Sequence, residues 1–95
     1  MTNVVVGFGR TGRSVARFFE ERAVSFWVAD DHLDGKAKAE LSALQHCEGV
    51  STLAELSPVT GQTWIVSPGI PLTRPLFQRA QDHGVELIND LHLFE

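Results

Sequence analysis

The chain has 95 residues, a hydrophobic content of 43% and a formal net charge of −4. This length suits one small domain, and the composition is ordinary for a water-soluble globular chain. The acidic balance, without any run of Lys or Arg, argues against a nucleic-acid-binding surface. No apolar run approaches the ~20 residues of a membrane span, and we expect no signal peptide. The single cysteine, Cys47, excludes an internal disulfide and fits a reducing, cytoplasmic setting.

The first expected strand, residues 3–6, leads directly into a glycine-rich turn. Gly7, Gly9 and Gly12 have the G-x-G-x-x-G spacing of nucleotide-binding βα turns. The first glycine permits a tight turn, the second lets a phosphate approach the backbone, and the third lets helix and strand pack closely. A helix expected over residues 13–22 would direct its positive end toward an incoming anion. A purely structural turn is the alternative.

The expected second strand, residues 25–29, ends in Asp30, Asp31 and His32. An acid at the end of the second strand is where a Rossmann-like site hydrogen-bonds a ribose or a base. These three residues are therefore candidates for ligand contact. The alternative is that they form a polar turn or a helix cap.

The rest of the chain continues to alternate between helix and strand. Ser51 is the expected N-cap of a short helix, and a later helix is expected to have Thr73 as its N-cap, Pro75 in its first turn and Gly84 at its end. This alternation predicts a single α/β domain with a Rossmann-like, doubly wound parallel sheet of about five strands in the order 3-2-1-4-5. The further expected helices are 36–44, 51–56 and 90–95, and the further strands are 45–50, 62–66 and 85–88.

In that strand order the first and fourth strands are neighbours where the order reverses, and ligands bind outside the carboxyl ends of the strands at such a point. The glycine turn and the segment Ser67-Pro68-Gly69-Ile70 would then form two walls of one crevice. Asp30 would close one side. Three loops therefore converge on one predicted binding site.

Residues for catalysis are harder to find. The sequence has no G-x-x-x-x-G-K-[ST] loop for ATP phosphates and no nucleophile elbow. His32, His46, His83 and His92 lack metal-ligand spacing to one another or to Cys47. The residues themselves therefore indicate a binding module with no catalytic or metal-ligating group.

Four segments taken together resemble the N-terminal domain of Mur ligases. They are residues 4–12 with Ser14, residues 28–30, residues 65–70 with Pro75, and residues 86–94, and the likeness extends over essentially the whole chain. It is greatest to the MurD type, which adds D-glutamate to UDP-N-acetylmuramoyl-L-alanine in peptidoglycan synthesis.

The resemblance implies that residues 1–95 form the domain that binds the UDP part of this substrate in a cytoplasmic, three-domain ligase. ATP and Mg²⁺ would belong to the central domain, and the third domain would help to bind D-glutamate. Both would be absent from this chain, which would bind uridine nucleotide without catalysing the reaction and without a cofactor of its own.

Carried over by position, the resemblance also implies which residues contact the UDP moiety. Close relatives often have Thr-Arg after the acid, with the arginine against the base. Here those positions are Asp31 and His32, and an imidazole could stack on uracil there. The implied substrate-binding residues are Gly9, Arg10, Thr11, Gly12, Asp30, Asp31, His32, Ser67, Pro68 and Gly69.

Two other functions remain open. An NAD-binding regulatory domain would share the glycine turn and would use Asp30 to hold ribose hydroxyls. A structural or interaction module would use the glycines only for packing, and Leu91 and Phe94 on one side of the last helix would suit it. Binding of UDP or of NAD distinguishes these readings.

Overall fold

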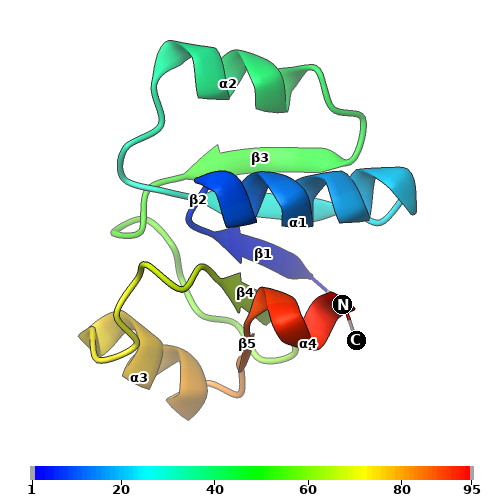
Figure 1. Ribbon diagram of the computed structural model, residues 1–95. Helices are drawn as coiled ribbons and strands as arrows, with labels where there is room; N and C mark the ends of the chain where they lie inside the picture. The colour runs from blue at the N-terminus through cyan, green and yellow to red at the C-terminus, as the bar shows by residue number, and fades with distance from the viewer. Residues whose placement is uncertain (1, 95) are drawn as a thin grey trace.

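The computed structural model describes residues 2–94 and contains a five-stranded parallel sheet flanked by helices (Figure 1). The strand order is β3-β2-β1-β4-β5, and every neighbouring pair is parallel, which confirms the expected α/β fold. Within residues 2–94 no helix has the length and apolar character needed to cross a bilayer. The elements are β1 Asn3–Val6, α1 Arg10–Glu21, β2 Phe26–Ala29, α2 Gly35–Ser42, β3 Cys47–Ser51, β4 Thr63–Val66, α3 Pro75–Asp82, β5 Glu86–Ile88 and α4 Asp90–Phe94.

The sheet separates two apolar cores. Val5 of β1 lies in the core beneath α1 and α2, whereas Val4 and Val6 lie in the core on the side of α3. On that second side Trp64 of β4 packs edge to face against Phe77, with ring centroids 6.3 Å apart. Because alternate side chains of a strand point to opposite faces, an unbroken run of valines suits a strand covered on both sides.

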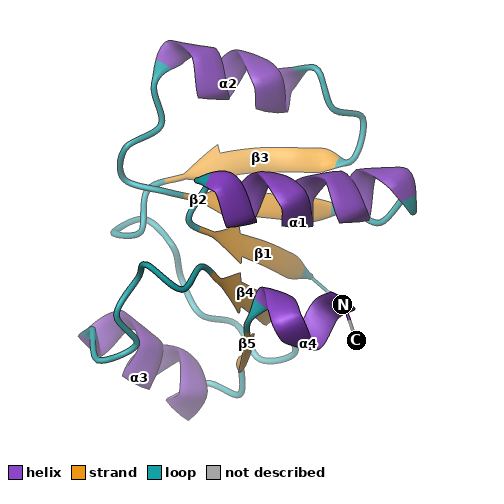
Figure 2. Cartoon of the chain, in the orientation of Figure 1, coloured by secondary structure: helices purple, strands orange, loops and turns teal. Residues whose placement is uncertain are grey.

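Because every neighbouring pair of strands is parallel, the connections that leave their carboxyl ends gather on one side of the sheet (Figure 2). The first of these connections is short. Gly9 is already the N-cap of α1, so the helix begins at Arg10, earlier than expected, and Gly12 falls in its first turn. The helix therefore starts directly above the end of β1.

The prediction of a helix over residues 51–56 is wrong, because the structure has the end of β3 and a turn there. Ser51 pairs with Ala29 in the sheet and caps nothing. The segment after it makes a single turn, in which the Thr52 N–H and hydroxyl donate to the Glu55 carboxylate at 3.1 and 3.0 Å. The Glu55 N–H donates back to the Thr52 hydroxyl at 3.2 Å. This reciprocal cap closes the turn locally, and no helix follows it.

The last two helices also differ from expectation in detail. Arg74, and not Thr73, is the N-cap of α3, because Pro75 takes the first helical position and holds the residue before it in an extended conformation. Gly84 ends the helix as expected, at φ +79°. In α4, Leu91 is 69% exposed. The side chain of Phe94, expected beside it, and Glu95 lie outside the described residues.

Glu20 fastens α1 to the connection between α2 and β3. Its carboxylate accepts hydrogen bonds from the N–H groups of Gln45 and His46 at 2.8 and 2.9 Å. Partial burial opposes the charged form, but these two donors and the nearby His46 outweigh it, so the pKa of Glu20 lies below its ordinary value of 4.5.

Replacing Gly12 with alanine should destabilise the fold, because a Cβ there would lie 2.0 Å from the carbonyl oxygen of Gly7. We expect the free energy of unfolding to fall by about 1–3 kcal/mol or more. Urea denaturation measures this loss. Gly35→Ala is the matched control, since nothing lies within 4 Å of its added Cβ. Equal stability of Gly12→Ala and the wild type would contradict the close approach.

Replacing Glu20 with glutamine should lower stability at neutral pH and much less in acid. A depressed folded-state pKa means that the charged carboxylate stabilises the fold above about pH 4.5, and that this stabilisation is lost as the pH falls through the folded-state value. Denaturation at about pH 7 and about pH 3 tests this sign. Glu21→Gln, an exposed neighbour on α1, is the control for charge. A loss for Glu20→Gln that is independent of pH would refute it.

Candidate functional site

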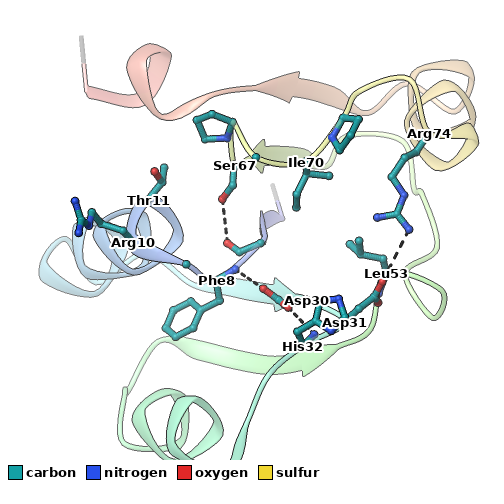
Figure 3. Close-up of a pocket in the computed structure, with 15 residues that line it drawn as sticks. Phe8, Arg10, Thr11, Asp30, Asp31, His32, Leu53, Ser67, Ile70 and Arg74 are labelled. Atoms are coloured by element: carbon teal, nitrogen blue, oxygen red, sulfur yellow. Dashed lines mark hydrogen bonds and ion pairs between the residues drawn. The ribbon is translucent and has the colours of Figure 1, made fainter.

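A crevice of about 520 Å³ opens at the carboxyl ends of β1, β2 and β4, where the strand order reverses (Figure 3). Such a point is where doubly wound sheets bind their ligands. The walls come from the glycine loop, the end of β2 and the segment after β4. The lining residues are Gly7, Phe8, Gly9, Arg10, Thr11, Asp30, Asp31, His32, Leu53, Ser67, Pro68, Gly69, Ile70, Pro71 and Arg74.

The structure brings together every residue that the resemblance implied for the substrate, except Gly12. Gly12 is buried in the first turn of α1, so its part is to let the helix approach the loop. Lining residues that lie outside the predicted walls of the crevice are Leu53, Pro71 and Arg74. Arg74 had one usable signal, because Pro75 marks the start of the helix after the fourth strand, which lies at the same edge of the sheet.

Asp30 holds the glycine loop against the end of β2. Its Oδ2 accepts a hydrogen bond from the Phe8 N–H at 2.6 Å, and its Oδ1 accepts one from the His32 N–H at 2.7 Å. Its own N–H donates to the carbonyl of Ser51 at 3.0 Å. Both carboxylate oxygens therefore have backbone partners before any ligand arrives, which gives Asp30 a structural task that sequence spacing did not reveal.

The loop is fixed from β4 as well. The Ser67 hydroxyl donates to the Gly7 carbonyl at 3.2 Å, and the Ser67 N–H donates to the Val6 carbonyl at 3.0 Å. Gly7 has φ +92°, in the left-handed region, and an added Cβ would lie 2.8 Å from a terminal carbon of Ile70. Glycine is therefore favoured at position 7 for two reasons: the backbone conformation is left-handed, and the surroundings leave no room for a side chain.

Arg13 supports the loop from behind the crevice. Its Nη1 donates to the Phe8 carbonyl at 3.1 Å, and its guanidinium lies 4.6 Å from the centroid of the Phe8 ring. Its Nε is paired with Glu40 of α2 at 3.0 Å. Phe8 is thus held at both of its backbone groups, by Asp30 at the N–H and by Arg13 at the carbonyl.

One end of the crevice favours an anion. The N-cap of α1 is Gly9, which offers no capping side chain, and the first turn contains no acidic residue. The first N–H groups of a helix lack intrahelical partners and carry its positive partial charge. Arg10 and Thr11 lie at this end (Figure 3), and Arg10 is exposed and adds a full positive charge. A phosphate would be bound well there.

The other end is partly apolar. Leu53 is 5% exposed, and Ile70 packs on the core below the segment after β4. Asp31 and Arg74 form an ion pair across this end at 3.9 Å (Figure 3). An apolar surface with a few placed polar groups is typical of a pocket for a small organic ligand.

Two further observations concern metal binding and nucleophilic chemistry. Within the described residues, no three His, Cys, Asp or Glu side chains gather as they would around a metal ion. Cys47 is half-buried, and burial raises the pKa of its thiol above the ordinary value of 9.0. At neutral pH it is therefore a protonated thiol, which is a poor nucleophile.

Comparison with known proteins gives the family. Residues 1–89 match the family model described as Mur ligase MurD-like, N-terminal domain. Relatives named UDP-N-acetylmuramoylalanine--D-glutamate ligase are 37% identical in Saccharophagus degradans, 33% in Nitrosococcus oceani and 36% in Pseudomonas fluorescens. The alignments cover 96%, 98% and 96% of this chain, but 22%, 21% and 21% of those proteins. The chain thus spans about a fifth of their length, and it belongs to the family of MurD-like N-terminal domains of Mur ligases.

Proposed function

We propose that this domain binds the UDP part of UDP-N-acetylmuramoyl-L-alanine for a ligase that adds D-glutamate in peptidoglycan synthesis. The main support for this proposal is the crevice. The N-terminus of α1, which has no capping side chain, opens into one end of it, and the other end combines apolar side chains with a few polar groups. A nucleoside diphosphate has the matching polarity, with charge at one end and a flat base at the other. The names of the relatives supply the rest of the substrate.

Each part of the crevice then has a role. The diphosphate lies against the backbone of Gly9 and near Arg10 and Thr11, where the helix offers N–H groups. The uridine extends past Asp30 toward Asp31 and His32. The opposite wall is the segment of Ser67, Pro68 and Gly69, which encloses the nucleotide from the side of β4.

The remainder of the reaction belongs to parts of the ligase outside this chain. ATP and Mg²⁺ are proposed to bind there, together with D-glutamate, since this sequence has no ATP phosphate loop. The domain alone therefore binds substrate and catalyses nothing. The cytoplasm is the proposed location, where nucleotide-linked substrates and ATP are available.

A regulatory NAD-binding domain is the competing function. It would use the same loop and would need the Asp30 carboxylate for ribose hydroxyls. Here both oxygens of Asp30 accept backbone N–H groups, so the position of this acid is explained without a ribose. Membership of a ligase family also favours the uridine nucleotide.

An NMR titration with UDP and, separately, with NAD tests the proposal. We expect UDP to shift the amide signals of residues 9–12, 30–32 and 67–70, and we expect NAD to leave them in place. Shifts caused by NAD alone would replace the proposal with the regulatory domain. Absence of any response to either nucleotide would refute nucleotide binding by this chain.

Gly9→Ala sharpens the same test. Nothing lies within 4 Å of a Cβ added at Gly9, so the methyl group would stand in the crevice without disturbing the fold. We expect UDP to bind about tenfold more weakly, roughly 1.4 kcal/mol, with little change in the urea midpoint. Gly35→Ala, which also adds a methyl group in open space, should bind as the wild type does. Unchanged affinity of Gly9→Ala would remove the loop from the site.

A further inference from the structure

Arg74 enters the apolar end of the crevice from the wall opposite Asp31 (Figure 3). It is the N-cap of α3, and Pro75 fixes its backbone in an extended conformation. Within residues 2–94, Asp31 is the partner of its guanidinium, with Nη2 and Oδ2 3.9 Å apart and the side chains 45% and 35% exposed. A pair this long and this exposed contributes little to stability, so the N–H groups of Arg74 remain available to a ligand.

Asp31 is the more firmly held of the two. Its Oδ1 accepts a hydrogen bond from the Leu53 N–H at 2.8 Å, which fixes the carboxylate on the connection after β3. Its Oδ2 is directed toward Arg74. One acceptor and one donor therefore stand side by side at this end of the crevice, and the pair joins its two walls.

The polarity of the crevice decides which part of a nucleotide reaches this pair. With the phosphates at the N-terminus of α1, the edge of the base farthest from the ribose points to Asp31 and Arg74. In a pyrimidine that edge carries the group on C4, across the ring from the glycosidic nitrogen. Uracil presents an oxygen acceptor there beside an N3–H donor, whereas cytosine presents an amino donor beside an acceptor nitrogen.

We infer that Arg74 is a specificity-determining residue that selects uracil over cytosine by donating to the oxygen on C4. This inference rests on the proposed function. An arginine side chain only donates, so at C4 it would face the cytosine amino group donor to donor, and the Asp31 carboxylate would face the cytosine N3 acceptor to acceptor. Asp31 accepts the N3–H of uracil and keeps the guanidinium in place. Arg74 thus adds a base-reading contact from the wall that the loop after β4 and α3 provide.

Calorimetric titration of wild type and Arg74→Gln with UDP, CDP and inorganic pyrophosphate tests this assignment. We expect the wild type to bind UDP at least about tenfold more tightly than CDP. Arg74→Gln should lower the affinity for UDP about tenfold and lower the affinity for CDP by less. Its affinity for pyrophosphate should change by less than about twofold. The control is Arg79→Gln, the same charge change on α3 outside this crevice, and it should bind all three as the wild type does.

The outcomes separate the inference from the proposed function. Equal losses for UDP and pyrophosphate in Arg74→Gln would show that Arg74 acts on the phosphates, and unchanged UDP binding would show that it acts on neither end. Either result overturns the inference alone. A wild-type chain that binds pyrophosphate but neither UDP nor CDP would overturn the proposed function and the inference with it.

Discussion

The carboxylate of Asp30, placed between the N–H groups of Phe8 and His32, is the interaction on which the site depends. It joins the loop after β1 to the residues after β2, two segments that are neighbours because their strands are paired. The position of the loop determines where α1 begins. The positive end of the helix dipole therefore lies at the crevice. Hydrogen bonds to a charged acceptor are stronger than those between neutral groups, so one side chain can hold the backbone here.

The three glycines of the loop have separate tasks that their shared spacing conceals. Gly7 adopts a conformation that other residues rarely take, and Gly12 lets α1 lie against the Gly7 carbonyl. Both are demands of the fold. Only Gly9 faces open space, so it is the glycine whose absent side chain leaves room for a ligand. A substitution at each position should therefore fail for a different reason.

The sheet order could be predicted from the sequence because it depends on patterns repeated along the chain. The valines of β1 indicate a strand buried on both faces, and the regular alternation of elements leaves few topologies. The prediction of a helix over residues 51–56 was wrong because Thr52 and Glu55 cap each other within one turn. Arg74 was missed because Pro75 indicates only where α3 begins. That this end of the helix lies at the crevice follows from the packing of α3 beside β5, which no local pattern expresses. The convergence of the loops at the switch point was predictable, but the bonds of Asp30 within it were not.

The most direct test of the account is the isosteric change Asp30→Asn, which replaces one acceptor oxygen with a donor. Hydrogen exchange of the Phe8 amide should be followed together with the affinities for UDP and for inorganic pyrophosphate, with Asp82→Asn on α3 as the control for charge. If Asp30 acts by holding the loop, the Phe8 amide should exchange faster, and the affinities for UDP and for pyrophosphate should fall by a similar factor. Loss of UDP affinity alone, with the Phe8 amide still protected, would show that Asp30 contacts the nucleoside directly and would contradict the account.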